Sequence, residues 1–194
     1  MKTEMREMLV ARDEILDFVT YGEQRDAIRG PALAAKRDRR VLVGDHLTLL
    51  FENHETIRYQ ILEMIRTEQI VRERDILHEL ETYNELLGGP GELGCTLLVG
   101  VEDPNERDVL LRRWLTLPEH LYVRLPGDAI VRATWDPRQV GEDRLSSVQY
   151  LKFAVGDAAP IACGSDHPEL TLEVSLTAAQ RDALAADLAR AAAG

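Results

Sequence analysis

Four side chains near the middle of the sequence are of types that can bind a divalent metal ion: Glu63, Glu68, His78 and Glu79. Carboxylate and imidazole groups are common ligands of such ions. Helical sites of this kind usually draw on four helices and on Glu-x-x-His pairs. The nearest string here is Asp75-Ile76-Leu77-His78. One hypothesis is therefore a metal-dependent enzyme, using a divalent metal ion at a carboxylate-rich site on these helices.

The helical phase of these residues bears on that hypothesis. At 100° per residue, Glu68 falls about 20° from the apolar Ile57, inside the apolar arc. Glu79 falls about 300° from Ile76, beside the corresponding arc of the next helix. His78 falls about 200° from Ile76, on the opposite and solvated face. We therefore expect the two glutamates, but not the histidine, to point into a helical hairpin.

A carboxylate that points inward needs a partner, because an unpaired charge in an apolar interior is very costly. Arg72 follows Glu68 by four residues. Residues at this spacing are neighbours on one helical face, so a structural ion pair is the simplest prediction. A bound metal ion and a shared proton are the alternatives.

The two cysteines, Cys95 and Cys163, lie far apart, and neither belongs to a Cys-x-x-Cys pair. A thioredoxin-like motif, a zinc ribbon and an iron–sulfur cluster motif are thus unsupported. Two separate thiols in a reducing cytosol are predicted, with a single disulfide as the alternative. Cys163 also opens a string that contains Asp166 and His167. These are metal-capable types, but the composition is typical of a turn before a strand, and we expect a turn.

No motif of high catalytic specificity occurs. The remaining histidines near the ends of predicted elements, His46, His54 and His120, are expected to be surface or capping residues. There is no Gly-x-Ser-x-Gly elbow, Walker A loop or Rossmann fingerprint. The string Gly88-Gly89-Pro90-Gly91 is glycine-rich but lacks the lysine and helix start that a phosphate-binding loop needs.

The net charge argues against nucleic-acid binding as a main role. The chain of 194 residues has a formal net charge of −11 and a pI of about 4.9. Nucleic acids and anionic membranes both attract proteins with a positive field. One basic cluster, Lys36, Arg37, Arg39 and Arg40, is expected to be a solvated helix end. Weak nucleic-acid binding through this cluster is the alternative.

The N-terminal half is predicted to be mainly helical. Residues 1–40 favour short helices broken at Gly22 and at Gly30-Pro31, and residues 41–51 favour an extended segment. Apolar residues then recur at helical spacing over residues 53–71 and 75–87. The second of these helices is stopped by Gly88-Gly89-Pro90. The short connection between them predicts an antiparallel hairpin.

The second half is predicted to be mainly extended. Strand patterns cover residues 96–101, 147–155 and 170–176, and a hairpin is predicted from 121–125 and 130–135. Helices are predicted at 106–115 and from the N-cap Thr177 through Arg190. The fold class is α+β: N-terminal helices with a hairpin, a mostly antiparallel sheet and a C-terminal helix. We expect a single domain over residues 1–194, with a helical half at 1–90 and a β half at 91–194.

Nothing in the sequence predicts a membrane association or export. Residues 1–8 carry charges throughout and lack the apolar core of a secretory leader. No apolar run approaches the roughly 18 residues that would span a bilayer. A cytoplasmic protein is expected.

Several strings of the sequence resemble an uncharacterised bacterial family that is known only as a domain of unknown function. They are Phe51-Glu52-Asn53, Tyr59-Gln60, Glu63-Met64-Ile65-Arg66, Glu68, His78-Glu79-Leu80, Thr82-Tyr83-Asn84-Glu85-Leu86 and Ser147-Val148-Gln149-Tyr150-Leu151-Lys152-Phe153. Members of that family tend to be encoded beside rubrerythrin-like proteins and iron–sulfur proteins related to heterodisulfide reductase subunits. The resemblance thus implies an association with redox or oxidative-stress metabolism, and it supplies no catalytic residues.

Three functions remain after these observations. We favour an acidic accessory or interaction protein that binds a redox partner, either a rubrerythrin-like or an iron–sulfur protein. In one version of this hypothesis the protein itself forms a homodimer. The alternatives are the metal-dependent enzyme with Glu68, Glu79, Glu63 and His78, and the nucleic-acid binder with the cluster at 36–40. The substrate and reaction do not follow from these residues.

Overall fold

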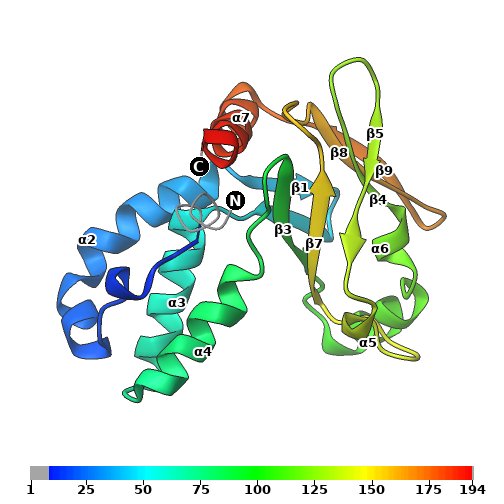
Figure 1. The fold of residues 1–194 in the computed structure, drawn as a ribbon. Helices are drawn as coiled ribbons and strands as arrows, with labels where there is room; N and C mark the ends of the chain where they lie inside the picture. The colour runs from blue at the N-terminus through cyan, green and yellow to red at the C-terminus, as the bar shows by residue number, and fades with distance from the viewer. Residues whose placement is uncertain (1–8, 194) are drawn as a thin grey trace.

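The computed structural model describes residues 9–193 and has two hydrophobic cores. One core lies among helices near the N-terminus, and we call this part the helical lobe (residues 9–39 and 52–88). The other lies between two β-sheets, and we call this part, with the C-terminal helix, the β lobe (residues 40–51 and 89–193). Figure 1 shows the two lobes side by side.

The helical lobe consists of a 3₁₀ turn and three α-helices. They are η1 (Arg12–Glu14), α2 (Phe18–Arg37), α3 (His54–Glu68) and α4 (Glu73–Asn84). Its core is built from aliphatic side chains and one tyrosine: Val10, Ile15, Tyr21, Ile57, Ile61, Leu62, Ile65, Ile76 and Leu87. The three isoleucines of α3 follow the helical spacing that the sequence shows, so the hairpin of α3 and α4 is confirmed.

The expected breaks at Gly22 and Gly30-Pro31 are wrong, because α2 runs through both as one helix of 20 residues. All three residues are exposed, and a Cβ at either glycine would meet nothing within 4 Å. Pro31 removes one helical hydrogen bond. Burial of Tyr21 and Ala32 against the lobe, with Asp17 capping the first turn, keeps the helix continuous. Tertiary packing here outweighs local propensity.

The β lobe contains two antiparallel sheets. The five-stranded sheet has the order β1-β2-β3-β7-β6, and the four-stranded sheet has the order β5-β4-β8-β9. The strands are β1 (Arg40–Val43), β2 (Leu47–Phe51), β3 (Glu92–Val99), β4 (Leu121–Arg124), β5 (Ile130–Arg132), β6 (Thr134–Trp135), β7 (Val148–Ala154), β8 (Ala162–His167) and β9 (Leu170–Ser175). The α+β class is confirmed, and the extended residues 41–51 prove to be a hairpin that turns at Gly44, where φ is +66°.

The two sheets face each other across one core, and helices cover its ends (Figure 1). At one end α7 (Ala178–Ala193) inserts Leu184 and Leu188. At the other end lie α5 (Pro104–Arg113) and α6 (Leu117–His120). The predicted N-cap of the last helix is confirmed, because the hydroxyl of Thr177 accepts from the backbone N–H of Gln180 at 3.2 Å.

The expected turn at residues 163–167 is wrong, because these residues lie in β8 between β4 and β9. Ser165 and His167 face inward and are buried, whereas Asp166 faces outward. Gly164 belongs there because the ring of Tyr122 covers it, with the phenol carbon only 2.7 Å from where a Cβ would lie. The polar residues at 163–167 thus belong to a strand whose side chains alternate between the two faces, and the glycine is required by close packing.

Both cysteines are free thiols, as predicted. Cys95 on β3 and Cys163 on β8 belong to the core between the sheets and are almost fully buried. Burial raises the pKa of both thiols well above the ordinary range. Neither thiol is in a state to act as a nucleophile.

A buried ion pair joins the two lobes. The guanidinium of Arg39, just after α2, donates to both carboxylate oxygens of Asp187 on α7, at 2.7 and 2.8 Å. The amide of Asn53, which caps α3, also donates to Asp187 at 3.3 Å. The two charged side chains are only 11% and 13% exposed. The end of α2, the start of α3 and the C-terminal helix thus meet at one carboxylate.

Among residues 9–193, no helix is both long and apolar enough to cross a bilayer. The expectation about residues 1–8 concerns a segment outside the described part of the chain. That the whole chain folds as one domain stays a prediction.

The ion pair predicts a large loss of stability when one partner is removed. Arg39→Ala should lower the free energy of unfolding by about 3–5 kcal/mol, because it leaves the Asp187 carboxylate buried without its counter-charge. Arg37→Ala is the matched control. Its pair with Asp38 is at the surface, so the loss should be much smaller than that of Arg39→Ala. Urea unfolding followed by circular dichroism measures both, and equal losses would contradict the bridging role of Arg39.

Candidate functional site

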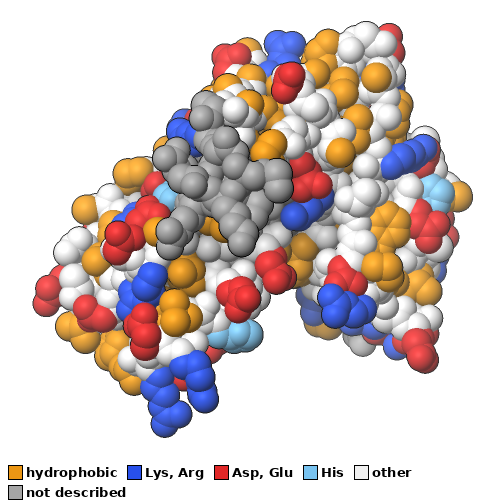
Figure 2. Space-filling view, in the orientation of Figure 1, with side chains coloured by type: hydrophobic (Ala, Val, Ile, Leu, Met, Phe, Trp, Pro, Cys, Tyr) orange, Lys and Arg blue, Asp and Glu red, His pale blue; other side chains and the backbone are white. Residues whose placement is uncertain are grey.

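A cleft separates the helical lobe from the β lobe and forms the candidate site. Figure 2 shows it as a notch below the centre of the molecule. It has a volume of about 430 Å³ and lies between α4 and the strands β6 and β7. Its lining residues are Thr82, Glu85, Leu86, Thr134, Trp135, Asp136, Gln139, Tyr150, Leu151 and Lys152.

The cleft continues into a neighbouring hollow of about 470 Å³ along α4. Glu85 and Lys152 line both, so the two are parts of one surface. The continuation adds two further carboxylates, those of Glu81 and Glu92. Together the two parts are large enough to hold several side chains of a ligand.

Strand alternation places the β side of the cleft. In β7, Gln149, Leu151 and Phe153 point into the core, whereas Val148, Tyr150 and Lys152 point outward. Tyr150 is 39% exposed and Val148 is 36% exposed. An aromatic ring thus lies on the outer face of the five-stranded sheet, facing the helical lobe.

The apolar surface extends across that sheet from the cleft. Leu42, Thr48, Leu98 and Val148 are cross-strand partners in one continuous row of β1, β2, β3 and β7. Leu42 is 63% exposed and Leu98 is 37% exposed. Contiguous exposed apolar residues are typical of interaction surfaces, whereas single ones are not informative.

The edge of β7 is incompletely paired in the cleft. Its neighbour β6 has only two residues, which pair with Leu151 and Lys152. Beyond them, the side-chain amide of Gln139 completes the pairing of Tyr150. The backbone N–H of Tyr150 donates to Gln139 Oε1 at 2.7 Å, and Gln139 Nε2 donates to the carbonyl of Tyr150 at 3.3 Å.

Carboxylates dominate the charge of the cleft. Glu81, Glu85 and Glu92 line it with Lys152, whose Nζ lies 3.5 Å from Glu92 Oε2, and Asp136 is paired with Arg138, which also lies near Glu85. Figure 2 shows acidic side chains on the helical side of the notch. The surface therefore favours a cationic ligand.

Tyr83 on α4 lies close to this surface. Burial raises the pKa of its hydroxyl, and the nearby carboxylates of Glu79 and Glu68 act in the same direction. Tyr150 across the cleft also contributes. The helical side of the cleft thus has a negative potential that reaches beyond its lining residues.

The predicted metal ligand Glu63 has a structural environment of its own. Its carboxylate accepts two hydrogen bonds from Arg25, at 2.7 and 2.9 Å, and one from the hydroxyl of Tyr21 at 2.6 Å. The hydrogen bonds from Arg25 lower the pKa of Glu63 to about 2. These contacts hold α2 against α3.

The expected orientation of Glu68 and its pair with Arg72 are wrong. Glu68 is the last residue of α3 and is exposed, and Gln69 then turns into the left-handed region with φ of 50°. Arg72 is therefore the N-cap of α4 and does not lie one turn further along the same helix. Because Gln69 ends α3, the 100° rotation per residue does not predict the orientation of Arg72 relative to Glu68.

The two remaining candidates also stay apart from a common centre. Glu79 is half-buried, as its position beside the apolar arc suggested, and His78 is exposed, as predicted. Within the described residues, no three His, Cys, Asp or Glu side chains lie close enough together to hold a metal ion. The structure does not bring Glu63, Glu68, Glu79 and His78 into one site, and metal binding by them stays an untested prediction.

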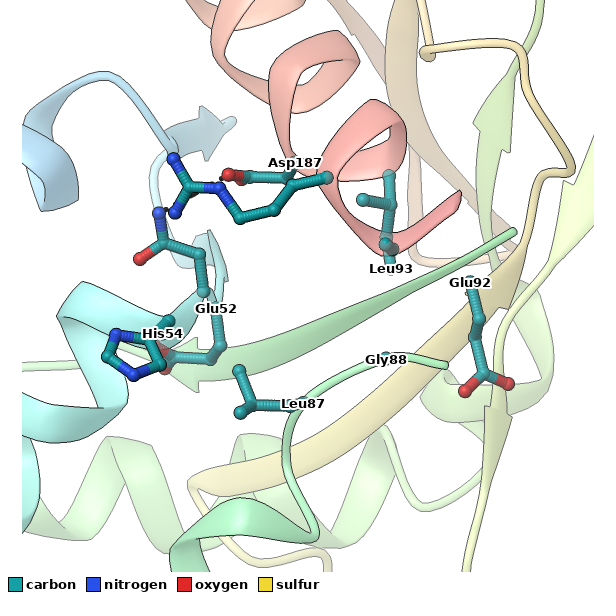
Figure 3. Close-up of a pocket in the computed structure, with 10 residues that line it drawn as sticks. Glu52, His54, Leu87, Gly88, Glu92, Leu93 and Asp187 are labelled. Carbon is teal, nitrogen blue, oxygen red and sulfur yellow. Dashed lines mark hydrogen bonds between the residues drawn. The ribbon is translucent and has the colours of Figure 1, made fainter. Parts of the chain in front are cut away.

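A second, much smaller pocket lies where α3, α7 and the loop after α4 meet (Figure 3). Its volume of about 50 Å³ is small for an organic ligand. The carboxylates beside it already have donors. Glu52 accepts from the hydroxyls of Thr56 and Thr96 at 2.5 and 2.7 Å, and Asp187 accepts from Arg39. This pocket is part of the seam between the lobes.

One polar cluster was not expected from the sequence. Asp166 accepts hydrogen bonds from His120 Nδ1 at 2.9 Å and from Arg132 at 3.0 Å, and Arg132 strongly lowers its pKa. The ring of His167 lies edge-on to that of His120, with centroids 5.2 Å apart. The end of α6 and the strands β5 and β8 meet here, so the local sequence pattern contained no signal of the cluster.

The basic cluster at 36–40 is largely used within the fold. Lys36 lies over the ring of Tyr59 at 5.1 Å and is half-buried. Arg37 pairs with Asp38, and Arg39 is the buried bridge described above. The expectation of a solvated helix end is therefore wrong for Lys36 and Arg39. Both are poorly placed to meet a phosphate backbone.

Comparison with known proteins identifies the family. Residues 9–188 match the family described as "Protein of unknown function (DUF3501)". The chain belongs to this family. No curated protein matches it. The matched residues include both lobes of this DUF3501 protein and the cleft between them.

A solved structure has the same fold as this DUF3501 chain. It is the crystal structure of a novel protein of unknown function from Burkholderia pseudomallei, solved at 1.90 Å resolution. The two are 30% identical, the TM-score is 0.85, and the match covers 93% of this chain and 100% of the other. The arrangement of the two lobes is therefore shared between the two proteins.

The environment of Glu63 predicts a pH-dependent contribution to stability. Its folded pKa of about 2 lies below the value of about 4.3 expected in an unfolded chain, so folding favours the ionised form. The stabilisation is complete above about pH 4.5 and is lost as the pH falls towards 2. Glu63→Gln should cost about 2–3 kcal/mol at pH 7 and about a quarter of that at pH 2.5. Urea unfolding at both values measures this, with the exposed Glu68→Gln as control, and a constant loss would contradict it.

The placement of the candidate ligands predicts the outcome of a metal analysis. Protein purified without a metal-chelating tag should show the same metal content in the wild type, Glu68→Ala and Glu79→Ala, because within residues 9–193 neither side chain belongs to a group of three metal-capable residues. Plasma mass spectrometry with an absorption spectrum measures the content. One equivalent of iron, manganese or zinc that both variants lose would instead support the metal-dependent enzyme.

Proposed function

We propose that this DUF3501 protein is an accessory protein that acts by binding another protein. The cleft between α4 and the β6–β7 edge carries this proposal. It combines exposed aromatic and aliphatic side chains with a rim of carboxylates, and it continues into an exposed apolar row on the sheet. Aromatic anchors within a polar rim are typical of protein interfaces.

The redox partner remains part of the proposal. The resemblance stated for the sequence leads us to propose a rubrerythrin-like or iron–sulfur protein as that partner. This chain contributes two buried thiols of raised pKa. Its share in such a partnership would therefore be recognition, with electron transfer left to the partner's own centres.

Binding to purified candidate partners tests the proposal. Isothermal titration of the protein against the rubrerythrin-like and iron–sulfur proteins of the same genome should give a dissociation constant in the micromolar range or tighter. Tyr150→Ala should weaken it at least about tenfold, as loss of an aromatic anchor does. Val109→Ala, at an exposed position of α5 that is 54% exposed, is the control and should have no effect.

Two outcomes would contradict the proposal. Failure of both candidate proteins to bind would overturn the redox partnership. Light scattering that showed a homodimer closed over Tyr150 would indicate that a second copy, and not a partner, occupies the cleft. In that case the Tyr150→Ala variant would be a monomer.

A further inference from the structure

We infer that the cleft binds an extended, basic segment of the partner protein, and that this segment pairs with β7 in the place that Gln139 now holds. The inference rests on the proposed function and deepens it, because it names the chemistry of the partner and the way in which it is held. Three features of the cleft carry it: the state of the β7 edge, the side chains on either side of that edge, and their charge.

The first feature is the edge itself. A primary amide has the same donor and acceptor as a peptide group, and Gln139 uses both of them on the backbone of Tyr150. An incoming strand would supply those two hydrogen bonds from its own backbone. The exchange conserves the pairing of Tyr150, so it leaves neither backbone group of Tyr150 without a partner.

The segment that holds Gln139 is well suited to such an exchange. Gln139 ends η2 (Pro137–Gln139), a single 3₁₀ turn with no buried residue. Its start is capped by Asp136, whose carboxylate accepts from the backbone N–H of Arg138 at 2.9 Å. The turn itself has no side chain in the core, and it lies between Trp135 and Val140, which both pack against the core and anchor its two ends.

The second feature is the alternation of side chains that a strand at this edge would have. Successive side chains of the segment would point to opposite faces of the sheet. On the outer face they would meet α4, whose exposed residues here are Thr82 and Glu85. On the other face they would meet Trp135, which packs against the core. A segment of alternating character fits the two environments.

The third feature is charge. Glu81 and Glu85 are exposed on the α4 side of the cleft. Cationic side chains at the outward positions of the segment would neutralise them, and apolar side chains at the intervening positions would contact Trp135. A second copy of this chain is a poorer occupant, because each copy has a formal net charge of −11.

A displayed library of random dodecapeptides, selected on the full-length protein, tests this. We expect the enriched peptides to alternate lysine or arginine with aliphatic or aromatic residues. N-methylation of a synthetic enriched peptide at alternate backbone amides should weaken binding at least tenfold in one register and little in the other, because only one set of amides pairs with β7. Fluorescence anisotropy of the labelled peptide measures both.

Protein variants place the peptide in the cleft. The double variant Glu81→Gln/Glu85→Gln should bind the peptide about tenfold more weakly at low salt. The double variant Glu102→Gln/Glu106→Gln removes two exposed carboxylates near α5 and is the matched control. Gln139→Ala should tighten binding several-fold, because nothing then has to be displaced. If Gln139 had a purely structural role, Gln139→Ala would change the free energy of unfolding and leave the affinity for the peptide unchanged.

Several results would overturn the inference: no enriched peptide, acidic enriched peptides, equal sensitivity to N-methylation in both registers, or affinities that the cleft variants do not change. A homodimer that Gln139→Ala strengthens would show that a second copy takes the edge. These failures are separate from that of the proposed function. If a redox protein binds equally well to the wild type and the cleft variants, the proposed function stands and the inference is overturned. If peptides bind in the cleft but no redox protein binds, the pairing with β7 stands and the redox partnership is overturned.

Discussion

The geometry of this protein depends on one buried carboxylate, that of Asp187. It lies on the last helix of the chain and binds Arg39 from the end of α2 and Asn53 from the start of α3. A charge at this depth is stable only while its donors stay in place. The three contacts therefore define how the helical lobe lies against the β lobe. Because β1 and β2 follow Arg39 directly, the same contacts place the first hairpin of the five-stranded sheet.

The cleft is a result of that placement. Glu52, just before α3, accepts a hydrogen bond from Thr96 on the outer face of the five-stranded sheet. Tyr150 is the cross-strand partner of Thr96 on β7, and there the cleft opens between the sheet and α4. The side chains of Tyr150 and Val148 are therefore exposed on this face, which is no sign of weak packing.

Local periodicity predicted most of the elements. The helices at 53–71 and 75–87 and the alternating strands at 147–155 and 170–176 have strong patterns, and all four exist with shorter or shifted ends. The failures came where tertiary contacts decide: α2 continues through Gly30 and Pro31 because its inner face is buried, and β8 is a strand although its sequence is polar and contains glycine. Neither has a local signal strong enough to reveal it.

The candidate site was less predictable than the fold. Glu68 and Glu79 were placed from helical phase, yet Glu68 lies exposed at the end of α3. Arg25 could not be matched to Glu63 without the packing of α2 on α3. Tyr150 lay in a predicted strand, but the apolar pattern of that strand did not predict that its ring would point outward. The role of Gln139 was not predicted either, because it depends on an irregular turn coming back beside β7.

The two cysteines have a practical consequence. Their thiols lie in the core between the sheets, and burial holds both in the protonated form. An alkylating reagent in solution can reach them only when the sandwich opens, so the rate of modification reports the frequency of that opening. The alkylation rate of the two native cysteines thus measures how often the β lobe unfolds. The measurement needs no added label, and it can be made with a ligand bound in the cleft.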